Sequence, residues 1–369
     1  METLSIYIHW PFCQKKCPYC DFNSYAEQSI DAQQWQKAYG VSLLESLEHT
    51  GKREVVSIYF GGGTPSLMPP FILEDILEKI EQIHHLSSNI EITLEANPTS
   101  FEQSRFKAFK AAGINRLSIG VQSLRDDALK FLGRWHNVAD AMQTLEFAHK
   151  YFNRYSFDLI YARPEQSLND WAKELNEAID LAKGHLSLYQ LTIEPATEFG
   201  RKKVQPAKDD MAAEMYLYTL ETMEKAMMAA YEVSNFASAG QQSRHNLAYW
   251  KMNDWVGIGP GAHGRFTQDG QRIATQDSLY PDGWLKKVMA NNHGRQSMSI
   301  IPFEEQITEQ IMTGLRMAEG ISFELIHHLD SERIETLITQ GLLKRLPNGN
   351  IAATYQGWLV LNSLLAWLL

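Results

Sequence analysis

All three cysteines of this 369-residue chain lie in one short stretch, Cys13-Gln-Lys-Lys-Cys17-Pro-Tyr-Cys20. Structural cysteines of a protein core are not usually clustered in this way. Three thiolates on one tight loop can each hold one iron of a [4Fe–4S] cluster, which leaves the fourth iron open to a small molecule. The alternative is a zinc site with three cysteines and one histidine, for which His9 is a candidate. The spacing C-x3-C-x2-C favours the iron–sulfur cluster, because zinc sites more often use paired C-x2-C motifs.

A glycine-rich stretch, Phe60-Gly-Gly-Gly-Thr-Pro65, follows the second predicted strand. On its own this motif is weak, because it lacks the Gly-Lys-Ser/Thr ending of a phosphate-binding loop and could be only a tight turn between a strand and a helix. Its position gives it weight, since it lies one strand–helix unit after the cysteines. Together the two motifs predict a shared binding site.

Alternating strands and helices are predicted over most of the chain, and they would bring these motifs to one edge of a sheet. The predicted strands are residues 4–9, 55–60, 90–95, 117–121, 155–160 and 186–193. Segments 71–83 and 168–182 carry apolar residues at helical spacing. Strands separated by amphipathic helices indicate a parallel sheet, with its functional residues at the carboxyl ends of the strands. Six such units predict a partial (β/α)6 barrel, although a doubly wound sheet has the same periodicity.

The pattern changes after about residue 200. Residues 210–230 predict one methionine-rich helix, whose methionines we interpret as core filler, and 231–270 predict a loop region. From about residue 302 short helices follow, with a hairpin turn at 347–350 that is typical of a winged-helix-like module. The apolar segment 355–369 predicts a terminal helix docked on its own domain. We therefore divide the chain into residues 1–270 and 271–369.

Composition excludes several classes of protein. The formal net charge is −10, from 34 Lys+Arg against 44 Asp+Glu, which argues against nucleic acid as a partner and favours a packing role for the winged-helix-like module. Three cysteines are too few for a disulfide framework. The first residues lack the pattern of a signal peptide, and no apolar run is long enough to span a membrane. The expected location is the cytoplasm.

These motifs resemble the signature of the radical S-adenosylmethionine (radical SAM) superfamily. That signature is C-x3-C-x2-C with an aromatic residue, here Tyr19, before the last cysteine, and a glycine-rich loop placed against the methionine part of S-adenosylmethionine (SAM). The segments YIHWPFC, FGGGTP, EANP, GVQS, LGRWH and FDLI further resemble the coproporphyrinogen-oxidase-like branch, which contains oxygen-independent coproporphyrinogen III oxidases and haem chaperones. The resemblance spans about residues 4–265, and the C-terminal module is compatible with it.

The resemblance implies a [4Fe–4S] cluster on the three cysteines and one or two SAM sites around it. The implied SAM-binding residues are Tyr7, Gly62, Gly63, Thr64 and Glu95 beside the cluster, and Tyr19, Gln122, Arg134 and Asp158 farther along. A carboxylate such as Glu95 can hold a ribose hydroxyl or an ammonium group, and an arginine can bind a carboxylate through two hydrogen bonds. Taken singly, each of these residues is equally well explained as a polar group at a strand end.

Three features favour the haem chaperones within this branch. Phe22 stands where the oxidases carry a fourth cysteine, and only twelve residues precede Cys13, whereas the oxidases have a longer extension there. His245-Asn-Leu-Ala-Tyr-Trp250 matches the HNxxYW motif of the haem chaperones, so His245 is the first candidate for a haem ligand and His263 the second.

The expected function is therefore that of a haem chaperone, which binds the cluster, SAM and haem and delivers haem to haem-requiring respiratory proteins. Its expected partners are haem and haem-accepting proteins, with membrane-associated acceptors and a homodimer left open. The alternative is an oxygen-independent coproporphyrinogen III oxidase, in which cleavage of SAM starts an oxidative decarboxylation.

Overall fold

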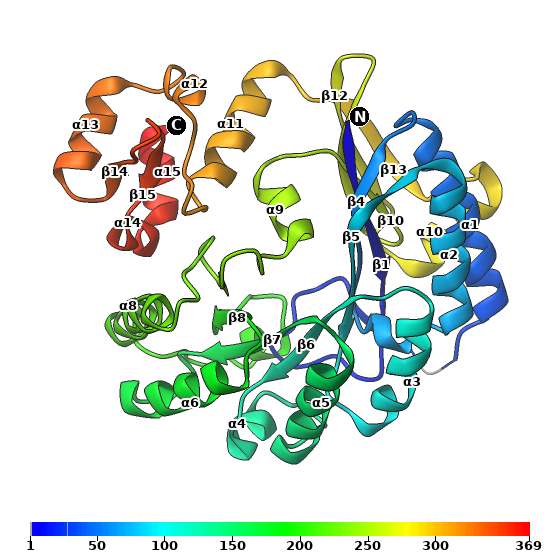
Figure 1. Cartoon of the computed structure of the whole chain (residues 1–369), viewed down its shortest axis with the longest axis horizontal. Coiled ribbons are helices and arrows are strands. Elements are labelled where there is room, and N and C mark those ends of the chain that lie inside the picture. Colours follow the sequence, from blue (N-terminus) through cyan, green and yellow to red (C-terminus); the bar gives the residue numbers. More distant parts are fainter. Residues whose placement is uncertain (1, 28) are drawn as a thin grey trace.

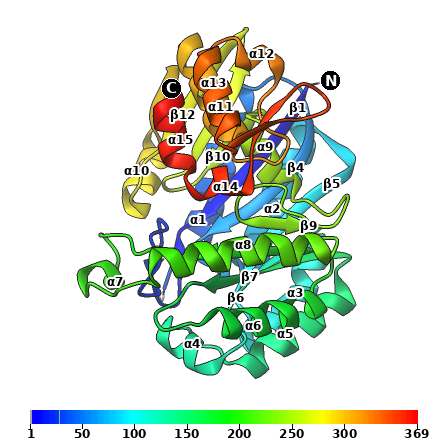
Figure 2. The same ribbon diagram turned by 90° about the vertical axis from the view of Figure 1, so that its left-hand side faces the viewer.

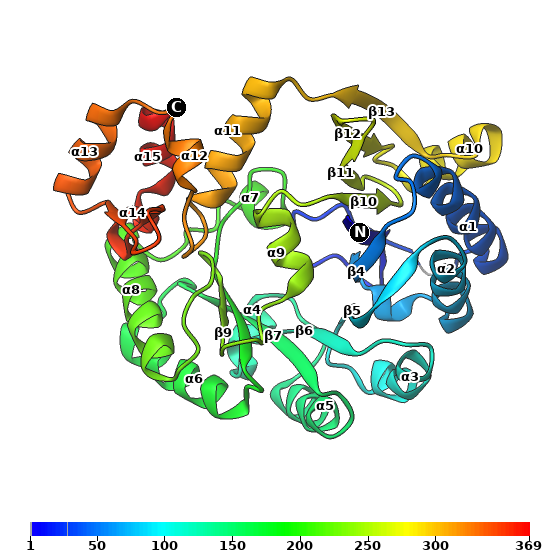
Figure 3. The ribbon, with the colours of Figure 1, turned by 45° about the horizontal axis from the view of Figure 1, so that its top comes forward.

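The computed structural model describes residues 2–27 and 29–369 of the chain, except for the side chains of residues 100–104 (Figure 1). An 11-stranded sheet forms the centre of this part of the chain, in the order β13-β12-β11-β10-β1-β4-β5-β6-β7-β8-β9. The run from β10 to β8 is parallel, whereas β9 and β11 to β13 pair antiparallel at the two ends. The sheet curves into an arc, which confirms the predicted partial barrel (Figure 3).

The six strands predicted from the sequence are all present, within one to five residues of the predicted ends. The strands of the sheet are β1 (Thr3–Trp10), β4 (Glu54–Gly62), β5 (His85–Ala96), β6 (Arg116–Gln122), β7 (Arg154–Tyr161), β8 (His185–Gln190), β9 (Asn235–Ala237), β10 (Trp255–Ile258), β11 (His263–Gln268), β12 (Gln271–Asp277) and β13 (Arg295–Ile300). Two short strands, β2 (Phe12–Cys13) and β3 (Tyr25–Ala26), pair with each other and enclose the cysteine loop.

Helices cover the convex side of the arc, as the apolar spacing of the sequence predicts. They are α1 (Ala32–Glu48), α2 (Pro70–Ile83), α3 (Ser100–Ala111), α4 (Asp126–Phe131), α5 (Val138–Tyr151), α6 (Leu168–Leu181), α8 (Asp209–Lys225) and α10 (Pro281–Asn291). Two short elements lie elsewhere: the 3-10 turn η1 (Pro65–Leu67) follows β4, and α7 (Glu198–Arg201) contacts the cysteine loop, where the backbone N–H of Phe199 donates to the carbonyl of Pro18 at 2.8 Å. Helices α6 and α8 lie side by side, and the Trp171 indole donates to the Thr219 hydroxyl at 2.8 Å between them (Figure 2). No helix in the described residues is long and apolar enough to cross a membrane.

The prediction of a loop region over residues 231–270 is wrong. It contains β9, the short helix α9 (Arg244–Trp250), β10 and β11. Helix α9 contacts β4 and lies inside the arc of the sheet (Figures 1 and 3). Residues of the HNxxYW motif are therefore placed within the barrel and not on a surface loop.

The C-terminal module has the predicted layout of a helix followed by a hairpin. Its elements are α11 (Phe303–Gly314), α12 (Phe323–Ile326), α13 (Ser331–Thr339), β14 (Leu343–Arg345), β15 (Ile351–Ala353), α14 (Tyr355–Leu359) and α15 (Leu361–Leu368). Four leucines of α15, Leu361, Leu364, Leu365 and Leu368, are buried, which confirms the docked terminal helix. The predicted division at residue 270 falls between the paired strands β11 and β12, so a division after β13 fits the sheet better.

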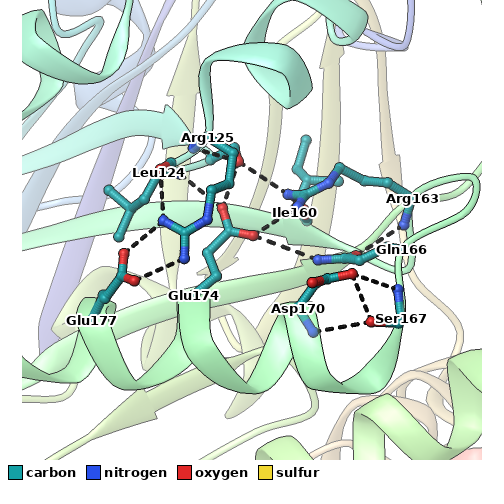
Figure 4. Close-up of polar contacts among 10 residues, drawn as sticks. Leu124, Arg125, Ile160, Arg163, Gln166, Ser167, Asp170, Glu174 and Glu177 are labelled. Atoms are coloured by element: carbon teal, nitrogen blue, oxygen red, sulfur yellow. Dashed lines mark hydrogen bonds and ion pairs between the residues drawn. The ribbon is translucent and has the colours of Figure 1, made fainter.

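A buried ion pair between Glu174 on α6 and Arg163, which follows β7, holds the loops after β6 and β7 (Figure 4). The Glu174 carboxylate accepts hydrogen bonds from Arg163 at 2.6 Å, from the backbone N–H of Leu124 at 2.8 Å and from the hydroxyl of Ser123. Arg163 also donates to the carbonyl of Ile160 at 2.8 Å. Because these loops continue directly from the strand ends that carry Gln122 and Asp158, the ion pair fixes one side of the site.

We expect Glu174→Gln to lower the free energy of unfolding by about 3–5 kcal/mol, because it leaves the buried Arg163 without its counter-charge. Glu177→Gln is the matched control on the same helix, since Glu177 pairs with Arg125 and its side chain is 52% exposed. That change should cost less than about 1 kcal/mol. Urea unfolding of the two variants measures the difference, and equal losses would contradict this role for Glu174.

Candidate functional site

A cavity of about 990 Å³ lies inside the arc, and the cysteine loop lies at its edge. The cavity is lined by all three cysteines and by every predicted SAM-binding residue, and also by His245 and His263. Residues from the carboxyl ends of β1, β4, β5, β6 and β7 meet there, as expected for a parallel sheet. The structure thus brings together all the residues that the sequence singled out.

The cysteine loop is held in place by hydrogen bonds at both ends. Lys16 donates to the carbonyls of Phe22 at 2.9 Å and Ser24 at 3.3 Å, which closes the loop on itself. The amide of Asn23 donates to the carbonyls of Pro260 at 2.8 Å and Leu279 at 2.9 Å, which anchors the loop to the segments that follow β10 and β12. The loop is therefore shaped by the protein and does not depend on a disulfide, since all three thiols are free.

Three free thiols facing one cavity are the donor set of a [4Fe–4S] cluster. The thiols of Cys13 and Cys20 are partly buried, and their burial raises their pKa values, to about 11 for Cys13. His9 fits a zinc ligand poorly, because one ring nitrogen lies 2.9 Å from the Tyr7 hydroxyl and the other 2.9 Å from the carbonyl of Asn23. The residues present therefore fit the iron–sulfur alternative better than the zinc alternative.

The glycine-rich loop runs directly beside the strand that leads to the cysteines. Gly62 has a φ of 122°, and a Cβ atom there would lie 2.7 Å from the ring of His9 and from the carbonyl of Trp10. At Gly63, a Cβ would lie 2.7 Å from the carbonyl of Phe12. Only glycine lets this loop approach so closely, so the loop forms the wall of the cavity next to the cysteines.

Glu95, at the end of β5, faces the cavity from below the glycine loop. It accepts a hydrogen bond from the hydroxyl of Tyr59 at 2.8 Å and one from the backbone N–H of Gly62 at 3.0 Å. Burial raises the pKa of Glu95 to about 7, with a smaller contribution from the charge of Asp158, while these two hydrogen bonds oppose the shift. Glu95 thus changes its charge near neutral pH.

We expect SAM affinity to fall about tenfold between pH 8 and pH 6, because the ionised carboxylate of Glu95 binds an ammonium group or a ribose hydroxyl more strongly than the neutral carboxyl does. The pKa of about 7 places this loss in that window as the pH falls. Equilibrium dialysis at constant ionic strength measures it. Glu95→Gln should bind SAM with little pH dependence, and an identical slope in both proteins would exclude Glu95 as the titrating group.

Arg134 connects the cysteine loop to the ends of two strands. Its guanidinium donates to the sulfur of Cys17 at 3.4 Å, to the carbonyl of Gly120 at 2.8 Å and to the side chain of Asn97. Asn97 in turn donates to the Thr64 hydroxyl at 3.0 Å. Nε of Arg134 is buried and has no hydrogen-bond partner among the described residues, which is rare for a buried donor.

Two more predicted residues line the same wall. Gln122 has a φ of 71°, and this left-handed conformation lies at the point where β6 ends. Asp158 on β7 has one carboxylate oxygen buried without a partner among the described residues, and burial raises its pKa to about 6. Buried polar atoms without partners are rare in proteins, so these positions are consistent with contacts to a bound molecule.

His245 is buried at the inner end of the cavity, 2% exposed. Its Nδ1 lies 2.9 Å from the hydroxyl of Ser57, which donates its own proton to Ser5, and its Nε2 lies 2.9 Å from the hydroxyl of Tyr249. Burial lowers the pKa of His245 to about 3, so the ring is neutral. A bond to iron would require Tyr249 to move away, and the haem-ligand role of His245 stays a prediction.

His263, at the start of β11, is the more accessible of the two predicted haem ligands. Its side chain is exposed and faces the cavity, and its ring makes no hydrogen bond within the part of the chain that the structure describes. Phe22 is 60% exposed at the same mouth, where the oxidases of the branch carry a cysteine. The mouth therefore offers a free imidazole beside an exposed aromatic ring.

The sequence analysis missed the polar lining of the barrel. On β6, the residues at alternate positions, Arg116, Ser118, Gly120 and Gln122, line the cavity, whereas Leu117, Ile119 and Val121 are buried on the other face. The same alternation places Ser187 and Tyr189 of β8 inside. A polar residue at every second position of a parallel strand could have predicted this lining. Parallel strands that are buried on both faces are otherwise apolar.

Comparison with known proteins shows the family to which the chain belongs. A family model described as "Radical SAM superfamily" matches residues 7–178. "Radical S-adenosyl methionine domain-containing protein 1, mitochondrial" of Bos taurus is 40% identical over 388 residues, which cover 100% of this chain and 88% of that protein. "Heme chaperone HemW" of Escherichia coli is 36% identical over 373 residues, which cover 99% and 98%. The chain belongs to the radical SAM superfamily, in the HemN/HemW branch.

The similarity to a solved structure extends over nearly the whole chain. The solved structure of the coproporphyrinogen III oxidase HemN from Escherichia coli superposes with a TM-score of 0.82 and covers 99% of this chain and 89% of that one. The sequence identity is 18%, so this similarity concerns the fold. It confirms the α/β barrel expected from the sequence.

Proposed function

We propose that this radical SAM protein is a haem chaperone, which binds a [4Fe–4S] cluster, SAM and haem and delivers haem to haem-requiring respiratory proteins. The observation that carries the proposal is the 36% identity with the haem chaperone HemW over nearly the full length of both chains. Phe22 at the position of the oxidases' fourth cysteine supports it.

Cys13, Cys17 and Cys20 would hold the cluster, because they are the free thiols at the cavity. SAM would be held between the glycine loop and the strand ends. The residues in question are Tyr7, Gly62, Gly63, Thr64 and Glu95 on one side, and Tyr19, Gln122, Arg134 and Asp158 on the other. Bound together, a reduced cluster and SAM can supply radical chemistry, while the protein orients SAM and limits access to it.

We propose the mouth of the cavity as the haem site, with His263 as the first candidate for the axial ligand. Its free ring contrasts with that of His245, whose two nitrogens already have partners. Haem at the mouth would be exposed to an acceptor protein, which suits transfer. His263→Ala should therefore shift the Soret band of bound haem more than His245→Ala does.

The partners that we propose are haem and haem-accepting proteins, including membrane-associated ones. A homodimer, location in the cytoplasm and the absence of a nucleic-acid partner stay predictions. The compartment is a separate question, because relatives of this chain include proteins named as mitochondrial.

A haem titration and a coproporphyrinogen III assay on one anaerobically reconstituted preparation test the function. We expect tight haem binding and no protoporphyrinogen formation with SAM and reductant present. Formation of protoporphyrinogen together with absent haem binding would replace the chaperone by the alternative, an oxygen-independent coproporphyrinogen III oxidase.

A further inference from the structure

Arg116 is a buried arginine that lines the cavity. It begins β6 at the inner part of the cavity, it is 2% exposed, and its guanidinium makes no hydrogen bond or ion pair with the described residues. Buried arginines are almost always paired, because removing a charge from water is costly. The missing partner of Arg116 therefore needs an explanation.

One acidic side chain inside the protein already accepts hydrogen bonds from four other groups. Glu91 on β5 accepts from Arg154 at 2.6 Å, from the backbone N–H groups of Arg244 at 2.9 Å and His245 at 3.2 Å, and from the hydroxyl of Ser243 at 3.3 Å. Oε1 accepts three of these bonds and Oε2 accepts the one from Arg154, and Arg116 makes no hydrogen bond or ion pair with either oxygen. Glu91 thus compensates Arg116 only at longer range, through its charge.

A second unsatisfied group lies beside Arg116. Thr93 is its register partner on β5, so the two side chains point to the same side of the sheet. The hydroxyl of Thr93 is buried and has no partner among the described residues. Two adjacent strands therefore leave hydrogen-bond donors unsatisfied at the same depth of the barrel.

We propose that Arg116 is the inner anchor of the cavity and binds a carboxylate group of the ligand that enters from the cysteine end. A planar guanidinium matches a carboxylate through two parallel hydrogen bonds. Glu91 and Asp158 nearby disfavour a doubly charged group such as a phosphate, so a single negative charge suits the position. A carboxylate of this kind belongs either to a tetrapyrrole side chain or to the amino-acid part of SAM.

Two pairs of probes distinguish these sources. Haem is compared with haem dimethyl ester, whose carboxylates are blocked, and SAM is compared with decarboxylated SAM. Each is titrated into wild type, Arg116→Met and Arg265→Met. The last is a control that also removes one positive charge, because Arg265 pairs with Glu309 outside the cavity. The haem pair rests on the proposed haem-chaperone function, whereas the SAM pair rests only on membership of the radical SAM superfamily.

In wild type and Arg265→Met, we expect one of the two free-carboxylate probes to bind about tenfold or more tightly than its counterpart without the carboxylate. This is the effect expected of one charge-assisted hydrogen bond. In Arg116→Met the two members of that pair should bind within about twofold of each other, while the blocked form binds as in wild type. Iron content and thermal unfolding report whether the variant is folded. If Arg116→Met does not fold, Arg116→Gln and Arg116→Lys are read in its place.

Equal binding within both pairs in wild type, or a preference that persists without Arg116, would overturn the proposal and leave Arg116 solvated by water in the cavity. Failure of haem to bind the wild type at all would remove the proposed function, and the SAM pair would then decide about Arg116 alone.

Discussion

Cys17→Ala should lose the brown colour, the broad visible absorption and nearly all of the roughly four irons per chain expected of a [4Fe–4S] protein. Cys13, Cys17 and Cys20 are the only cysteines of the sequence, so no other thiol can replace the lost ligand. Cys13→Ala and Cys20→Ala should behave in the same way. Iron and sulfide analysis after anaerobic reconstitution measures the loss.

Phe22→Ala is the control for this series. Phe22 lies on the same loop and its side chain is 60% exposed, so the variant should keep its full iron content. Retention of about four irons in Cys17→Ala would refute the cluster assignment. Zinc in place of iron in the anaerobically purified wild type would favour the alternative site.

Gly62→Val should weaken SAM binding by about a hundredfold or more while the cluster is retained. A Cβ at this position would lie 2.7 Å from the ring of His9 and from the carbonyl of Trp10, so the new side chain would clash with both. A φ of 122° is also unfavourable for a β-branched residue. The loop must then move away from the cavity wall. Equilibrium dialysis against SAM and iron analysis measure the two properties separately.

Gly51→Val is the control that introduces backbone strain without a steric clash. Gly51 also has a positive φ, 63°, but nothing lies within 4 Å of a Cβ at that position. This variant should lose stability and bind SAM normally. Unchanged SAM affinity in Gly62→Val would show that the glycine loop does not contact the ligand.

The sequence predicted the barrel and its site because each carries a local signal. Alternating strands and helices give the parallel sheet, and polar residues after each strand meet at its carboxyl edge. The cysteines and the glycine loop could be located for the same reason, since they follow adjacent strands β1 and β4. The parallel pairing of β1 and β4 is enough to place these two loops next to each other.

Other features depend on contacts that no local pattern reveals. Helix α9 has seven residues and is stabilised by distant partners, such as the bond between His245 and Ser57, so its segment was expected to be a loop. His245 is consequently buried, although its segment was expected to be a loop. Strands β12 and β13 extend the sheet by antiparallel pairing, which breaks the strand–helix alternation, so the predicted boundary at residue 270 falls inside the sheet.

Transfer of haem is the most direct test of the chaperone. The haem-loaded protein is mixed with a haem-free respiratory cytochrome in detergent, and the Soret bands of donor and acceptor are followed in time. Excess apomyoglobin in a parallel sample traps released haem and gives the spontaneous dissociation rate. We predict that the cytochrome gains haem faster than this rate, as the donor loses it. Transfer no faster than spontaneous release would contradict a delivery function.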